Sequence, residues 1–133
     1  ARAHARSIAA EMHAGFRPLR MALPMNLGRH GRPLAGGLAD DVQADIARID
    51  ALLSGTRAAF GQDGPYLFGA DLTVADAMFA PVIARFLGYG VQLSTVAADY
   101  AALLRAHPLM ARWYDDAARE PEAWHLERFE TLA

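Results

Sequence analysis

The chain has 133 residues, no cysteine and a formal net charge of −2. This length suits one domain with a sizeable core and is short for a two-domain enzyme. The lack of cysteine excludes disulfides, thiolate metal sites and a cysteine nucleophile within this chain, and the scattered arginines give no case for nucleic acid or an anionic membrane.

No apolar run approaches the roughly 18 residues of a membrane-spanning helix, and no signal peptide is visible, so we expect a cytoplasmic protein. The first residue is not methionine, and Ala1 stands at the start of a helical pattern that is already under way. We therefore expect this chain to be a fragment of a longer protein.

Apolar residues recur at helical spacing almost everywhere, and strand-like alternation is nearly absent. The first predicted helix covers residues 2–26. Pro18 lies inside it, lacks an N–H and must free the carbonyl of Ala14, so we expect a kink there. The apolar face of this helix is predicted to comprise Ile8, Met12, Phe16, Leu19 and Leu23.

Residues 26–37 are rich in glycine and proline and predict a connecting loop. A second helix is expected to start at Asp40 and Asp41, whose charges suit a helix N-terminus, and to run to about Phe60. Its buried face is predicted to comprise Val42, Ile46, Ile49 and Leu53. The next predicted loop covers residues 61–72.

The segment Gly69-Ala-Asp-Leu-Thr-Val-Ala-Asp76 predicts a well-defined helix start. Thr73 can accept a hydrogen bond from the backbone N–H of Asp76, and Asp76 can accept one from the N–H of Thr73. This reciprocal capping box places a carboxylate at the positive end of the helix dipole. The helix is expected to run to about Gly88, with Pro81 interrupting its hydrogen bonds.

Two further helices are predicted at residues 95–106 and 108–119, the second with Pro108 in its first turn. The first of these is expected to turn Val96, Tyr100, Leu103 and Leu104 inward. Pro121 is expected to start a final short helix that carries Trp124, Leu126 and Phe129. The sequence therefore predicts an all-α bundle of five to six helices in a single domain, residues 1–133.

Two segments carry a family resemblance. The capping box lies between a Gly-Pro-Tyr-Leu-Phe-Gly loop and an Ala-Met-Phe-Ala-Pro helix, and resembles the buried helix start of the glutathione transferase C-terminal domain. The segment Ile8-Ala-Ala-Glu-Met-His-Ala-Gly-Phe-Arg-Pro-Leu19 is similar to the opening helix of that domain in the bacterial beta class, with its Glu-Leu-His-basic-Gly-Phe-x-Pro-Leu pattern. Ala14 departs from this pattern, because the family often has a basic residue there. The resemblance covers essentially the whole chain.

The resemblance implies a helical domain that lines the pocket for an electrophilic co-substrate and contributes to a homodimer interface. The glutathione-binding, thioredoxin-like N-terminal domain of the family is missing from this chain, which should not be catalytic alone. The implied reaction is attack by the glutathione thiolate on a small hydrophobic electrophile, or thiol–disulfide exchange, in a bacterial detoxification enzyme. Glutathione is then a co-substrate, and no cofactor is expected.

His13 matches a family histidine that faces the active-site crevice, which implies that it stabilises a thiolate or shapes the co-substrate pocket. Arg6 matches a polar position that reaches glutathione across the dimer. On the predicted first helix, Arg6, His13, Arg17 and Arg20 share a broad stripe, which is either a binding face or a solvated one.

Methionine and aromatic side chains adapt in shape and suit a pocket that accepts several electrophiles, although ordinary core packing is the alternative. The candidates for this pocket are Met12, Phe16, Met21, Tyr89 and Trp124. Thr73 and Asp76 are expected to be structural. The five histidines lack metal-ligand spacing, and neither a nucleophile elbow nor a phosphate-binding glycine loop is present, so no metal site is predicted.

Two other hypotheses remain open. Helical domains similar to those of glutathione transferases also act as non-catalytic interaction modules. A cysteine, serine or tyrosine at the first strand–helix turn of the upstream sequence, with a cis-proline loop and a Glu/Gln-Ser pair, would favour the enzyme. An unrelated helical bundle would place the helix start at Thr73 on the surface rather than in the core.

Overall fold

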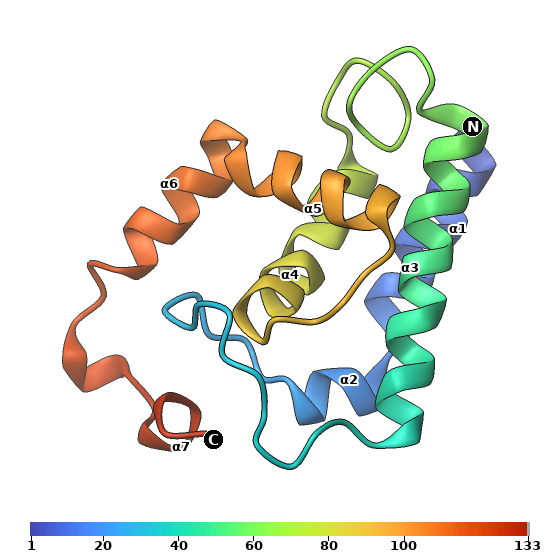
Figure 1. Ribbon diagram of the computed structural model, residues 1–133. Helices are drawn as coiled ribbons and strands as arrows, with labels where there is room; N and C mark the ends of the chain where they lie inside the picture. The colour runs from blue at the N-terminus through green and yellow to red at the C-terminus, as the bar shows by residue number, and fades with distance from the viewer. Residues whose placement is uncertain (133) are drawn as a thin grey trace.

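Every regular element in residues 1–132, the part of the chain that the computed structural model describes, is a helix. One isolated bridge joins Tyr66 and Gly69. The helices are α1 (Arg2–Ala14), α2 (Arg17–Ala22), α3 (Asp40–Phe60), α4 (Val74–Gly88), α5 (Thr95–Ala106), α6 (Pro108–Ala117), a 3-10 turn η1 (Glu122–Trp124) and α7 (Glu127–Glu130) (Figure 1). The predicted all-α fold is confirmed. Within residues 1–132, no helix combines the length and apolar character needed to cross a membrane.

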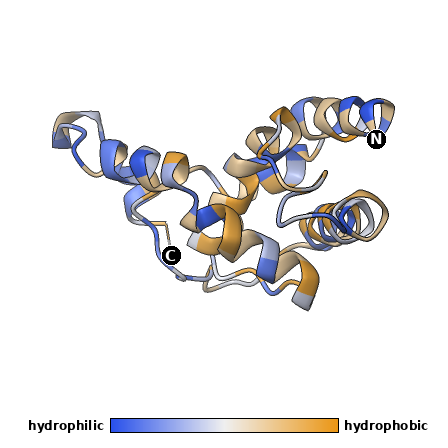
Figure 2. Cartoon of the chain, turned by 90° about the horizontal axis from the view of Figure 1, so that it is seen from above, coloured by the Kyte–Doolittle hydropathy of each residue, from blue (hydrophilic) through white to orange (hydrophobic). Residues whose placement is uncertain are grey.

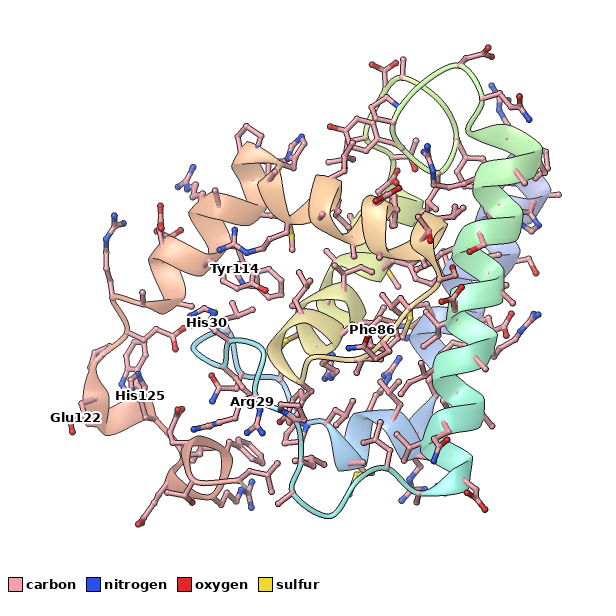
Figure 3. The ribbon with its side chains drawn as sticks, viewed as in Figure 1. Arg29, His30, Phe86, Tyr114, Glu122 and His125 are labelled. Atoms are coloured by element: carbon pink, nitrogen blue, oxygen red, sulfur yellow. The ribbon has the colours of Figure 1, made fainter. Side chains whose placement is uncertain are left out.

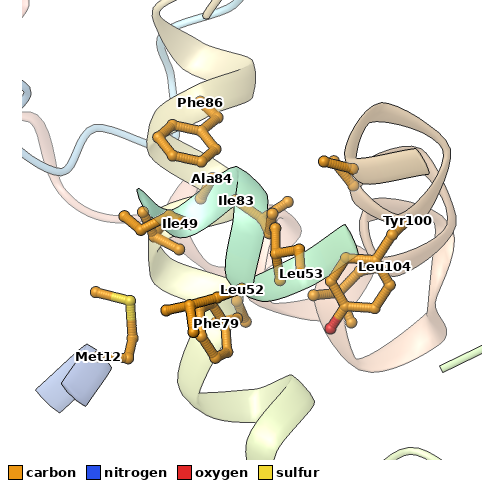
Figure 4. Close-up of a cluster of buried hydrophobic side chains, with 14 of the residues drawn as sticks. Met12, Ile49, Leu52, Leu53, Phe79, Ile83, Ala84, Phe86, Tyr100 and Leu104 are labelled. Carbon is orange, nitrogen blue, oxygen red and sulfur yellow. The ribbon is translucent and has the colours of Figure 1, made fainter. Parts of the chain in front are cut away.

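Helix α4 forms the centre of the core, and both α1 and α5 pack against it (Figure 1). Its sequence is apolar around most of its circumference, as a helix surrounded by others requires. The most hydrophobic ribbon accordingly lies in the middle of the molecule (Figure 2). Phe79 and Ile83 of α4 lie in one cluster with Ile49 and Leu53 of α3 (Figure 4), and all four side chains are at most 1% exposed. The predicted inward face of α3 is confirmed.

The capping box at the start of α4 is present, with Thr73 half-buried and the carboxylate of Asp76 in the core. Asp76 is fully buried, and its Oδ2 accepts hydrogen bonds from the backbone N–H and the hydroxyl of Thr73, at 2.8 and 2.7 Å. Its Oδ1 accepts from the N–H of Leu67 at 3.0 Å and from the hydroxyl of Tyr100 at 2.9 Å. The carboxylate therefore joins the loop before α4, the start of α4 and the middle of α5.

The expectation of one kinked helix over residues 2–26 is wrong. α1 ends at Ala14, Phe16 adopts a left-handed backbone with φ of 59°, and α2 begins at Arg17. Pro18 lies in the first turn of α2, where its missing N–H has no intrahelical partner to lose. Breaking the helix ahead of the proline avoids the clash of its ring with the carbonyl of Ala14.

Two expectations near the C-terminus also differ from the structure. Val96 is 46% exposed, because Ser94 caps α5 and the inward face of this helix runs through Ala97, Tyr100 and Leu104. The final predicted helix is divided into η1 and α7, which are separated at His125 and Leu126. α4, in contrast, continues without a break past Pro81.

Candidate functional site

The outward face of α1 holds the two residues that the resemblance singled out. Arg6 and His13 are seven residues apart and therefore lie on one line along the helix. Both side chains are exposed, whereas Ile8 and Met12 on the inward face are 2% and 5% exposed. The structure thus leaves Arg6 and His13 accessible to a substrate or a partner domain.

The single acid of α1, Glu11, lies on another side of the helix from Arg6 and His13 and is already paired. Glu11 accepts two hydrogen bonds from Arg48 of α3, at 2.8 Å from Nε and 3.0 Å from Nη2. The bond from Arg48 lowers the pKa of Glu11 below its ordinary value, so the carboxylate stays ionised and engaged at neutral pH. Arg6 and His13 therefore have no uncommitted carboxylate on their own helix.

Arg20 does not belong to this face, which corrects the predicted stripe of four basic residues. The break at Phe16 turns α2 away from the line of α1, and the guanidinium of Arg20 reaches back to the carbonyls of Met12 and His13. These are carbonyls of the last turn of α1, which lack intrahelical partners and carry the negative end of the helix dipole. Arg20 therefore caps the C-terminal end of α1, where His13 lies.

Replacing Arg20 by alanine is expected to lower the free energy of unfolding by about 1–2 kcal/mol, because the charged donor of two hydrogen bonds is lost while the carbonyls gain access to water. Urea unfolding measures this change. Arg17→Ala is the matched control, since Arg17 is an exposed arginine on the same helix. Equal losses from the two variants would contradict the capping role of Arg20.

The five residues predicted for a co-substrate pocket do not gather around one cavity in the described part of the chain. Met12, Phe16 and Tyr89 are 5%, 8% and 3% exposed and belong to the core, whereas Met21 and Trp124 are 72% and 69% exposed. Tyr89 also lines a cleft of about 680 Å³ between α3 and the loops at residues 33–38 and 89–94. Trp124 lines a different cleft, at the C-terminal end. That these five residues line one co-substrate pocket stays a prediction.

Arg29, which sequence reasoning missed, is buried against Tyr89. Its guanidinium carbon lies 4.2 Å from the centroid of the Tyr89 ring, and only 3% of the residue is exposed. Burial raises the pKa of Tyr89, while the charges of Arg29, Arg85 and Arg32 act in the opposite direction. The phenol therefore keeps its proton and donates to the carbonyl of Pro24 at 3.0 Å. An arginine in a Gly- and Pro-rich loop gives no sequence signal of burial.

Histidine and carboxylate side chains in residues 1–132 form no group of three that could hold a metal ion. The arrangement on α1 is instead suited to binding an anion, because a guanidinium and an imidazole lie exposed on one line and no carboxylate of α1 lies on that line.

Comparison with known proteins gives one family. The sequence model of the family described as glutathione S-transferase, C-terminal domain, matches residues 4–116, which include most of α1, all of α2 to α5 and most of α6. A search of curated proteins found no match. The family match spans most of the chain, and the full burial of Asp76 in the first turn of α4 argues against an unrelated bundle. This chain belongs to the glutathione S-transferase C-terminal domain family.

Proposed function

We propose that this chain is the helical domain of a glutathione transferase, and that the outward face of α1 is turned toward a separate glutathione-binding domain. The observation that carries the proposal is the exposed pair Arg6 and His13 on one line of α1, whose single acid is paired with Arg48 on another side of the helix. The match to the family supports the same assignment.

The chemistry of glutathione is complementary to this face. The tripeptide carries two carboxylates and a thiol, and its thiolate is the nucleophile. An imidazole N–H of His13 can donate a hydrogen bond to the thiolate and so favour it over the thiol. Arg6 can pair with a glutathione carboxylate. In the proposed substitution, the sulfur forms a bond to the electrophilic carbon as the leaving group departs with its electron pair.

The proposed co-substrate is a small hydrophobic electrophile, and the proposed working form is a homodimer with a role in detoxification. Met12 and Phe16 are buried behind the end of α1, so they would support His13 rather than touch the electrophile. Met21 is exposed on α2 and is the accessible apolar candidate near this end of the helix.

Replacing His13 by alanine in the full-length protein is expected to lower kcat for 1-chloro-2,4-dinitrobenzene conjugation about 10- to 100-fold. This range corresponds to the loss of one hydrogen bond to a charged group, about 1.5–3 kcal/mol. KM for glutathione should change little, because the bond strengthens as the thiolate forms. Steady-state kinetics measure both constants, and circular dichroism verifies that the variant is folded.

His30→Ala is the matched control, because His30 is an exposed histidine in the loop after α2, outside α1. Unchanged kinetics in the His13 variant would remove His13 from the site. A full-length protein that neither binds glutathione nor conjugates it would instead favour a non-catalytic interaction module.

A further inference from the structure

His13 lies in the last turn of α1, and the chain leaves the helix two residues later, at the extended backbone of Gly15. The last carbonyls of a helix have no donor within the helix, so a last turn frays unless other groups hold it. A side chain in a fraying turn takes several positions, whereas a group that must meet a reacting sulfur needs one. The contacts at this end of α1 therefore bear on the proposed role of His13.

Arg20 supplies the donors that this turn lacks. Its Nη2 donates to the carbonyl of His13 at 2.8 Å and also to the carbonyl of Met12. The carbonyl of Glu11 accepts from the N–H of Gly15 at 2.8 Å. Of these three successive carbonyls, two therefore depend on one guanidinium. The bond to the carbonyl of His13 fixes the backbone of that residue, and with it the direction in which the imidazole leaves the helix.

Arg20 can hold the turn because α2, on which it lies, is anchored at both ends. Its neighbour Leu19 is fully buried, and the N–H of Leu19 donates to Oδ2 of Asp45 on α3 at 3.1 Å. At the other end of α2, Nε of Arg85 on α4 donates to the carbonyl of Leu23 at 2.9 Å. Side chains from two core helices thus fix this short helix, and the guanidinium of Arg20 reaches α1 from a fixed element.

We propose that Arg20 is a positioning residue for the thiolate reaction, and that it holds the imidazole of His13 where it meets the glutathione sulfur. This inference rests on the proposed function, because Arg20 acts only through His13. It goes beyond the capping role, since a cap stabilises the fold, whereas a positioning residue also sets the rate at which the folded protein works. Arg20 is half-buried and bonded to the backbone of α1, so it is assigned no contact with substrate.

A double-mutant cycle in the full-length protein, with glutathione and 1-chloro-2,4-dinitrobenzene, tests the proposal at a temperature where circular dichroism shows every variant folded. Arg20→Ala is expected to lower kcat about fivefold with little change in KM for glutathione, because the imidazole is displaced while the binding groups remain. In the His13→Ala background the same change should lower kcat by less than about 1.5-fold, since no imidazole is left to position. Arg20→Lys keeps a charged donor near the two carbonyls and should restore most of kcat.

Arg32→Ala is the matched control. Arg32 is an exposed arginine that also donates to a backbone carbonyl, that of Glu130 at 2.9 Å. The loop that carries it, marked by Arg29 and His30 in Figure 3, lies away from α1. Its replacement should therefore leave kcat unchanged. If Arg20→Ala does not fold, the smaller change Arg20→Gln takes its place in the cycle.

The cycle separates this inference from the proposed function. An Arg20 effect that is equally large with and without His13, or one that is absent while the His13 variant is slow, would overturn the positioning role alone. Normal kinetics of the His13 variant, or a full-length protein without transferase activity, would contradict the proposed function and the positioning role with it.

Hydrogen exchange gives a second readout that does not depend on catalysis. In Arg20→Ala the amide of Gly15, whose bond to the carbonyl of Glu11 closes the last turn of α1, should exchange about tenfold faster. Amides in the middle of α3 should keep their protection. An unchanged exchange rate at Gly15 would show that the turn does not need Arg20, and would by itself overturn the proposal.

Discussion

Replacing Asp76 by alanine is expected to lower the free energy of unfolding by about 3–5 kcal/mol. The change removes a fully buried carboxylate that accepts four hydrogen bonds. It leaves the N–H of Leu67 and the hydroxyl of Tyr100 in the core without their acceptor, and each buried group then loses its hydrogen bond without gaining water. Because small domains have only about 5–15 kcal/mol of stability, much of the protein is expected to unfold at moderate temperature.

Urea unfolding followed by circular dichroism measures this loss. Asp71→Ala is the matched control, since Asp71 is an exposed carboxylate in the same loop, and it should change stability by less than about 0.5 kcal/mol. If the Asp76 variant is as stable as this control, the buried network does not hold α4 in place.

Tyr100→Phe gives a milder test of the same network if the Asp76 variant does not fold. Burial above all, and then the charge of Asp76, raises the pKa of Tyr100 far above its ordinary value, so the phenol remains a hydrogen-bond donor at neutral pH. Removing its hydroxyl should lower the unfolding free energy by about 1–2 kcal/mol. The effect should shrink when Asp76 is already replaced by asparagine, because the two side chains act on each other.

Replacing Gly64 by alanine is expected to lower the free energy of unfolding by about 3 kcal/mol, at the upper end of the range for overpacking. A Cβ atom at this position would lie 2.4 Å from the backbone N and Cα of Ala70 and 2.5 Å from the carbonyl carbon of Gly69. These are backbone atoms, which cannot move aside as the end of a flexible side chain can. The loop at residues 61–72 would have to open where it leads into the capping box.

The loop is further held by Arg57, whose guanidinium donates to the carbonyls of Pro65 and Tyr66 at 2.6 and 2.7 Å. An opened loop would weaken these bonds as well. Gly36→Ala is the matched control, because no atom lies within 4 Å of a Cβ built there. Thermal and urea unfolding of the two variants would be compared, and near-equal stabilities would show that the loop adapts without strain.

Local patterns in the sequence predicted most of the helical framework. The spacing of Ile46, Ile49 and Leu53 identified the inward face of α3, since a helix repeats every 3.6 residues and an apolar stripe must be buried. The capping box at Thr73 and Asp76 was visible for the same reason, because both partners lie within one helical turn. Pro18 signalled an interruption, but its position alone did not show that the helix would end at Ala14 rather than bend.

Contacts between distant parts of the chain were decided only by the tertiary structure. The spacing rules placed Tyr100 inward but could not show that its hydroxyl would meet Asp76, 24 residues earlier. Arg29 is buried only because Tyr89 and Leu132 are brought to it from other elements.

The sequence by itself therefore determined the all-α class, most helix bounds, the capping box and the family resemblance, all of which rest on neighbours along the chain. The packing of the helices decided that Arg6 and His13 are exposed, that Glu11 pairs with Arg48, and that a cleft forms at the C-terminal end. The physical reason is that helical periodicity specifies which side of a helix faces inward, but not which other residues it meets there.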